Sequence, residues 1–142
     1  MIIFDTTVLA YAVGTDHPLR GPCVRLIEAL GADRIAATTT PEVIQEFAHI
    51  RSRRRPRSDA AARARSYHVA LAPLTVTTAD HLAAGLDLFA RQNRLGSFDA
   101  VLAAVALDLD AELVSADTAF GDVEGLRHVV PDQAGVDRLL GA

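Results

Sequence analysis

A chain of 142 residues, half of them apolar, is long enough to fold around one core and too short for several domains, so we expect a single domain over 1–142. The longest apolar run covers only 100–107 and no arginine or lysine precedes Arg20. We therefore expect neither a membrane span nor a secretory leader, but a cytoplasmic protein. Cys23 is the only cysteine, which excludes an internal disulfide, and a net charge of −4 gives no general affinity for polyanions.

Strands and helices are expected to alternate along the chain. Unbroken apolar runs such as 1–4 are typical of strands buried on both faces, whereas apolar residues at three- and four-residue spacing indicate helices. In chain order we expect a strand over 1–4, a helix over 22–30, a strand over 35–38, a helix from 41 to the proline at 56, a helix over 58–71, a strand over 74–77, helices over 79–91 and 97–109, strands over 113–114 and 129–130, and a helical turn over 136–140. This order predicts an α/β fold with helices on both faces of a mostly parallel sheet of about five strands.

Two aspartates directly follow expected strands. Asp5 ends the first strand and Asp117 comes just after the strand at 113–114, so both should lie at the edge of the sheet where open α/β folds bind ligands. If the two strands are neighbours, the carboxylates converge and raise each other's pKa unless a cation holds them. Each also has a local interpretation, because aspartate is common in turns.

Two further acids lie on expected helices. Asp99 falls in the first turn of the helix that starts near Ser97, where the helix dipole alone favours a negative charge. Glu46 lies between Val43 and Ile50, at the margin of an apolar face that a solvated glutamate would not normally occupy. The joint pattern of the four acids is more informative than any one of them.

Four short motifs that contain these acids resemble those of the PIN-domain ribonucleases. They are Ile3-Phe4-Asp5-Thr6-Thr7-Val8-Leu9, Pro41-Glu42-Val43-Ile44-Gln45-Glu46-Phe47, Phe98-Asp99-Ala100-Val101-Leu102-Ala103-Ala104 and Leu113-Val114-Ser115-Ala116-Asp117 with Phe120. Their spacing and the chain length are most similar to the VapC toxins of bacterial toxin–antitoxin pairs. The resemblance covers the whole chain and implies a three-layer α/β/α PIN-like domain.

The resemblance also implies the site residues and the partners. The family's metal-coordinating acids correspond to Asp5, Glu46, Asp99 and Asp117. Thr7, where the family often has asparagine or serine, and Ser115 correspond to supporting positions. Further implications are Mg²⁺ or Mn²⁺ as the cofactor, RNA as the substrate, a homodimer and a cognate antitoxin.

The chemistry of the four acids agrees with hydrolysis of RNA phosphodiester bonds by a metal-activated water. Mg²⁺ prefers oxygen ligands, keeps several waters and takes one or two protein carboxylates directly. We expect Asp5, Asp99 and Asp117 to hold the ion directly or through water. Glu46 is then either a ligand or the acceptor of the water's proton.

All fourteen basic residues other than histidine are arginines, so lysine-dependent chemistry is excluded. Five of them follow the Glu46 helix closely and are candidates for binding RNA phosphates, because guanidinium groups hold phosphate oxygens in pairs. These candidates are Arg51, Arg53, Arg54, Arg55 and Arg57. Alternatively, they form a solvated face or pair with surface acids such as Asp59.

Two other functions stay open from the sequence. A catalytically silent module on the same scaffold would bind RNA or an antitoxin without turnover, although all four acids are present. An aspartate-based phosphatase would use Asp5 as its nucleophile. The chain has Thr7 where such enzymes need a second aspartate, and no lysine for the supporting role.

Overall fold

The computed structural model describes residues 1–142. Its sheet has four strands, all parallel, in the order β2-β1-β3-β4. The strands are β1 (Ile2–Phe4), β2 (Ala37–Thr38), β3 (Glu112–Val114) and β4 (Arg127–Val129). The two central strands are the most apolar, and Phe4 of β1 and Leu113 of β3 have no exposed surface. This burial on both faces is typical of a parallel sheet covered by helices.

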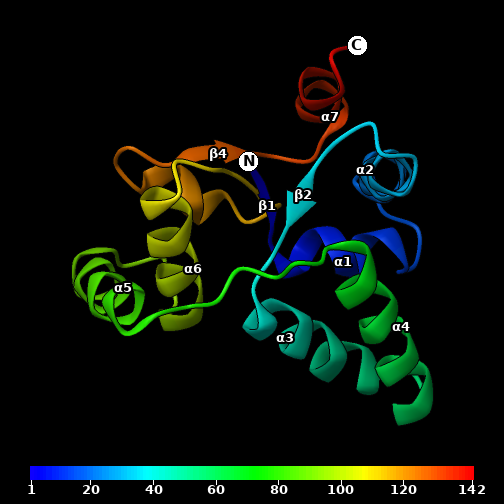
Figure 1. Ribbon diagram of the computed structural model, residues 1–142, viewed down its shortest axis with the longest axis horizontal. Coiled ribbons are helices and arrows are strands. Elements are labelled where there is room, and N and C mark those ends of the chain that lie inside the picture. The colour runs from blue at the N-terminus through cyan, green and yellow to red at the C-terminus, as the bar shows by residue number, and fades with distance from the viewer.

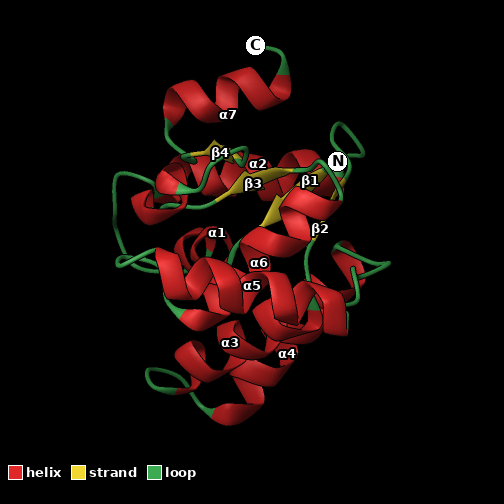
Figure 2. Ribbon diagram, turned by 90° about the vertical axis from the view of Figure 1, so that its left-hand side faces the viewer, coloured by secondary structure: helices red, strands yellow, loops and turns green.

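Helices surround the sheet on both sides. They are α1 (Thr6–Ala12), α2 (Arg20–Gly31), α3 (Pro41–Ser52), α4 (Arg57–Ala70), α5 (Ala79–Arg91), α6 (Ser97–Asp108), the 3₁₀ helix η1 (Thr118–Asp122) and α7 (Gln133–Leu140). Figures 1 and 2 show α7 on one side of the sheet and the α5–α6 pair on the other. The α3–α4 pair lies at the end of the molecule farthest from α7. The α/β fold with helices in two outer layers is therefore confirmed.

No helix of the structure combines the length and the apolar composition needed to cross a membrane.

Threonine side chains cap the N-termini of two helices whose residues line the cleft described below. Thr40 caps α3, because its Oγ1 accepts a hydrogen bond from the backbone N–H of Val43 (3.3 Å). Thr78 caps α5 reciprocally: its Oγ1 accepts from the N–H of His81, and Nδ1 of His81 accepts from the N–H of Thr78. These caps fix where each helix begins.

The helices α5 and α6 approach each other closely at Gly85. A Cβ atom at this position would lie 2.6 Å from the Cα of Val101, so no side chain fits there without a backbone shift. The side chain of Val101 is equally close, because its Cγ2 would also lie 2.6 Å from such a Cβ. Because these two helices form walls of the cleft described below, their close packing also fixes the width of that cleft.

The expected strand over 74–77 is wrong. This segment is an extended loop in which the N–H of Thr75 donates to the carbonyl of Thr39 (2.9 Å), but no ladder of hydrogen bonds follows. Val76 is 70% exposed, so the apolar residue that favoured a strand is not part of the core. The sheet consequently has four strands instead of about five.

Two smaller differences concern short elements. Helix α1 is absent from the predicted elements because its seven residues are too few to display a helical period, and it begins with the β-branched Thr6 and Thr7. Strand β4 covers Arg127–Val129 instead of 129–130. It lies at the edge of the sheet, where polar residues are tolerated, so an apolar pattern locates its ends poorly.

Candidate active site

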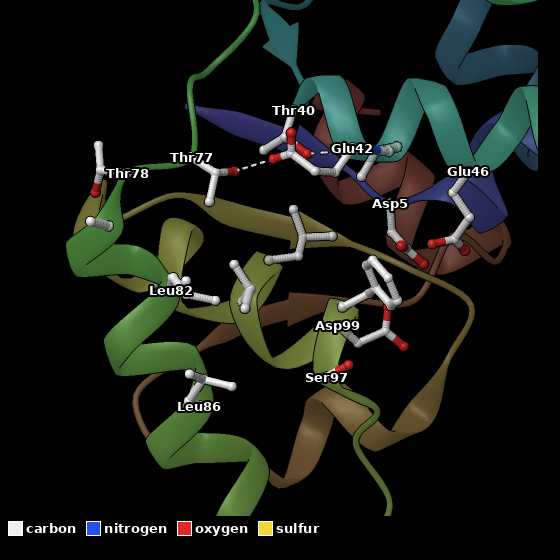
Figure 3. Close-up of a pocket in the computed structure, with 15 residues that line it drawn as sticks. Asp5, Thr40, Glu42, Glu46, Thr77, Thr78, Leu82, Leu86, Ser97 and Asp99 are labelled. Atoms are coloured by element: carbon white, nitrogen blue, oxygen red, sulfur yellow. Dashed lines mark hydrogen bonds between the residues drawn. The ribbon is translucent and has the colours of Figure 1, made fainter.

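A cleft of about 510 Å³ opens between α3, α5 and α6 (Figure 3). Three of the four predicted acids line it: Asp5, Glu46 and Asp99. Figure 3 shows these acids together at one end of the cleft and Leu82 and Leu86 of α5 at the other end. The cleft falls within the range of roughly 300–1,000 Å³ that is typical of ligand sites. It therefore has an acidic end and an apolar end.

Asp5 lies at the carboxyl end of β1 and is only 4% exposed. Its Oδ2 accepts hydrogen bonds from the hydroxyls of Ser115 (2.6 Å) and Thr7 (3.1 Å). Its Oδ1 has no hydrogen-bond partner in the protein. The two hydroxyls thus hold the carboxylate in one orientation and leave one oxygen for a ligand.

The same two hydroxyls join the ends of β1 and β3. Each donates its proton to Asp5 and accepts a backbone N–H: Ser115 Oγ accepts from Asp117 (3.0 Å) and Thr7 Oγ1 accepts from Ala116 (2.9 Å). Ser115 is completely buried. The structure therefore places both predicted supporting residues in contact with Asp5.

Asp117 has the turn role that its local interpretation predicts. Its Oδ1 accepts a hydrogen bond from the N–H of Ala119 (2.9 Å), which caps η1. This bond uses one carboxylate oxygen, so the local role and a role beside Asp5 are compatible.

Asp99 lies in the first turn of α6 and is half-buried. Burial, as the largest cause, and the charges of Asp5, Glu46 and Asp117 together raise the pKa of its carboxyl from 3.8 to about 7. Asp99 is thus close enough to each of the other three predicted acids to be repelled by its charge. The positive end of the α6 dipole offsets part of this repulsion.

Glu46 faces the same charge from α3. Burial raises the pKa of its carboxyl, as does the charge of Asp5, whereas the hydroxyl of Thr6 and the ring of His49 lower it. The Thr6 hydroxyl is nevertheless outside hydrogen-bond geometry: its Oγ1 is buried without any partner. A buried hydroxyl without a partner is uncommon in a complete site.

The residues present fit a hard divalent cation. Oδ1 of Asp5 has no partner in the protein, and the half-buried carboxyl of Asp99 lies close enough to feel its charge, so carboxylate oxygens are available to such an ion. No three histidine, cysteine or acidic side chains lie close enough to enclose an ion by themselves. Mg²⁺ does not require such a cage, because it retains several waters and takes one or two carboxylates.

Arg51 differs from the other four candidate arginines. Its Nε donates to Oδ2 of Asp59 (3.0 Å), one of its terminal nitrogens donates to the carbonyl of Val13 (3.0 Å), and its side chain is only 14% exposed. It therefore connects α1, α3 and α4. Of the two alternatives for Arg51, the structure contains the ion pair with Asp59.

The remaining four arginines lie in and next to the turn between α3 and α4, and they are exposed. They are Arg53, Arg54, Arg55 and Arg57. Arg53 also lines an outer groove of about 710 Å³ along α3, to which Glu46 and Asp99 contribute. One of these arginines thus shares a hollow with two of the acids.

Sequence reasoning does not find the apolar end of the cleft. Leu82 and Leu86 have the helical spacing of a core face, yet they are 49% and 48% exposed. Glu42 is explained from the sequence by the helix dipole alone, but it accepts a hydrogen bond from Thr77 at the cleft. One sequence signal could have pointed to the cleft: Phe98 is an aromatic residue directly before Asp99. In the structure its side chain is 74% exposed.

Comparisons with known proteins agree with this geometry. The PIN domain family matches residues 2–126. The chain is 52% identical to Ribonuclease VapC7 of Mycobacterium tuberculosis (strain ATCC 25618 / H37Rv) over 146 aligned residues, which cover 99% of each chain.

Two solved structures share the fold. The crystal structure of VapC20 from Mycobacterium tuberculosis, described as a sarcin–ricin loop cleaving toxin, superposes with a TM-score of 0.74 at 19% identity and covers 89% of this chain and 98% of its own. VapBC2 from Rickettsia felis, crystallised with a DNA fragment from its promoter, gives a TM-score of 0.69 at 16% identity, with 90% and 97% covered. The chain belongs to the PIN-domain family and, within it, to the VapC ribonucleases.

Proposed function

We propose that this chain is a metal-dependent endoribonuclease and the toxin of a type II toxin–antitoxin pair. The observation that carries the proposal is the convergence of Asp5, Glu46 and Asp99 at one end of a cleft, with Asp117 close enough for its charge to raise the pKa of Asp99. The names of the relatives support it, since one is a ribonuclease and another a toxin that cleaves the sarcin–ricin loop.

Asp5, Asp99 and Asp117 would hold Mg²⁺ or Mn²⁺, directly or through water. When bound, the ion supplies Lewis-acid chemistry, because it activates water and neutralises charge on phosphoryl oxygens. Asp5 would offer Oδ1, since the hydroxyls of Ser115 and Thr7 donate to Oδ2. Asp117 would offer Oδ2, since Oδ1 caps η1.

Glu46 is either a further ligand or the acceptor of the proton from the attacking water. Burial and the charge of Asp5 raise the pKa of Glu46, which makes its carboxylate a stronger base than an exposed glutamate. Its position on the wall of both the cleft and the outer groove suits either role.

The exposed arginines of the α3–α4 turn hold the RNA backbone near the acids. An acidic cleft repels a polyanion, so a basic surface beside it is required to bind the substrate. Arg53, Arg54, Arg55 and Arg57 supply that surface, whereas Arg51 is occupied by Asp59. Guanidinium groups suit this task because they donate to phosphate oxygens in pairs.

A toxin also requires a cognate antitoxin, and we include a homodimer in the proposal. Leu82, Leu86 and Phe89 follow helical spacing on α5 and are each about half exposed, which provides an apolar surface beside the cleft for a protein partner. The pairing of VapBC2 in Rickettsia felis is the precedent among the structural neighbours. Expression of this chain alone should arrest growth, and co-expression of a short reading frame beside its gene should relieve the arrest.

The decisive experiment is RNA cleavage by the purified protein with Mg²⁺ or Mn²⁺, with and without a chelator. Cleavage should require the metal, and Asp5→Asn should reduce it by about two orders of magnitude or more, because a key electrostatic group is lost. The matched control is Asp87→Asn, which removes the same charge from an exposed position on α5 and should cleave normally.

Three results would contradict the proposal in different ways. Equal activity of Asp5→Asn and wild type would remove Asp5 from the site. RNA binding without turnover in any metal would make the chain a silent binding module. Release of phosphate from small esters would instead indicate a phosphatase.

A further inference from the structure

Phe98 is the most exposed large apolar side chain of the cleft. It lies in the first turn of α6, one residue before Asp99, and is 74% exposed. Its ring pairs with no other aromatic ring of the chain. Most of the ring surface is therefore available to an external flat group.

The ring lies where two hollows meet. Phe98 lines the cleft that contains Asp5 and also the outer groove that extends along α3. The far end of that groove is basic, with a terminal nitrogen of Arg53 3.1 Å from Nε2 of His49. Phe98 thus lies on the border between the cleft and the groove, next to Asp99, and it is the only phenylalanine or tyrosine that lines either hollow.

This arrangement matches the repeating chemistry of an RNA strand. With the scissile phosphate at the acids, a nucleotide that flanks it lies within reach of the Phe98 ring, and Arg53 in the same groove is available to a further phosphate. Val101 and Leu102, three and four residues further along α6, share its face and also line the cleft. They extend the apolar wall, which suits the flat face of a base better than a charged backbone.

We propose that Phe98 is a positioning residue whose ring stacks on an unpaired nucleobase next to the scissile phosphate. The proposal rests on the ribonuclease function proposed above. A base can stack on a protein ring only when it leaves its own helix, so the substrate is an RNA loop or single strand and not a continuous duplex. Since every base has a π-face, Phe98 selects the unpaired state of the nucleotide and not its identity.

The test is a protein–RNA double-mutant cycle. The substrate is a hairpin RNA that wild type cleaves in its loop, prepared intact and with an abasic nucleotide on either side of the cleaved bond. Phe98→Ala should lower kcat/KM on the intact RNA by about 5- to 150-fold, the range expected for one base–aromatic stack. One abasic position should lower wild-type kcat/KM to a similar extent and have little further effect on Phe98→Ala.

Three further variants separate stacking from simple apolar contact. Phe98→Tyr keeps the ring and should retain cleavage, whereas Phe98→Leu keeps apolar surface without a ring and should lose it. Val69→Ala is the control, because Val69 is a large apolar side chain that is 78% exposed on α4 and lines neither hollow. Thermal melting should be unchanged for the Phe98 variants, since the ring contributes little to the core.

Each outcome decides the proposal. Wild-type kinetics for Phe98→Ala, or losses that add independently to those of the abasic RNA, would overturn stacking and assign the exposed ring to a protein partner. If wild type cleaves no RNA with any metal, the ribonuclease proposal fails, and the role of Phe98 fails with it. If wild type cleaves RNA and Phe98→Ala cleaves it equally well, only the role of Phe98 is contradicted.

Discussion

The acidic end of the cleft and the arginine-rich turn between α3 and α4 are built in opposite ways. The four acids come from four separate segments and meet only in the folded chain, where hydroxyls of Thr7 and Ser115 hold Asp5. The four exposed arginines are neighbours in sequence and extend from a turn into solvent. The acids are thus fixed before any ligand binds, whereas the arginines are free to adapt.

This difference has a physical cause. Like charges gathered in a half-buried site repel one another, and the raised pKa of Asp99 expresses that cost. The proposed nuclease chemistry accounts for this cost, because it needs charged groups held in fixed positions. Exposed guanidinium groups are screened by water and salt, so their crowding costs little, and their attraction for a polyanion depends on ionic strength.

The strongest way to test the fixed character of the acidic end is Ser115→Ala. The substitution removes the 2.6 Å hydrogen bond to Asp5 and the acceptor for the N–H of Asp117. Loss of such a supporting partner costs about 10- to 100-fold in metal affinity or activity, so the metal concentration for half-maximal cleavage should rise. Ser66→Ala, which removes an exposed hydroxyl on α4, is the control. An unchanged metal dependence would show that Asp5 is held by other contacts.

The adaptable character of the arginine turn is tested by the salt dependence of RNA binding. Replacing Arg53, Arg54 and Arg55 by alanine should weaken binding most at low salt and lower the log–log salt slope by roughly 2, since each phosphate contact with single-stranded RNA contributes about 0.7. Arg51→Ala should leave the slope unchanged and lower the free energy of unfolding by about 1–3 kcal/mol, because it breaks buried contacts with Asp59 and Val13. Equal slopes for wild type and the triple variant would make the turn a solvated surface only.

The smallest expected effect is a pH dependence of stability that only the acidic end produces. The pKa of Asp99 is raised from 3.8 to about 7 in the folded chain, so between these values the folded state binds more protons than the unfolded state. Its stabilising contribution is complete below pH 3.8 and is lost as the pH rises through about 7. In a chelator, the melting temperature should therefore fall over this window, and Mg²⁺ or Mn²⁺ should restore it at the upper end.

Asp99→Asn should flatten this dependence in the chelator, because the amide does not titrate. The control is Asp80→Asn on α5, which lies outside the cleft and should follow wild type. A melting temperature of wild type that rises between pH 4 and 7 would contradict the assigned cause.

Much of the fold follows from local signals in the sequence. Apolar runs predicted the two central strands, and Thr40 and Thr78 predicted the starts of α3 and α5, because hydroxyl caps and unbroken apolar strands depend on neighbours in the chain. The prediction of a strand at 74–77 was wrong because strand formation does not depend on neighbours in the chain alone. A strand needs a hydrogen-bonding partner along its length, and the segment itself carries no record of whether one is present.

The sequence by itself determined the family and predicted the four acids and their supporting hydroxyls, because each motif is a short local pattern tied to one strand end or helix start. Only the tertiary structure decided what those residues contact: it aimed Oδ1 of Asp5 away from its two hydroxyl partners, withdrew Arg51 from the other arginines and left Phe98 exposed between two hollows. The reason is that a side chain's surroundings are set by elements distant in the chain. Burial, repulsion between carboxylates and the shape of a cleft arise only when those elements pack together.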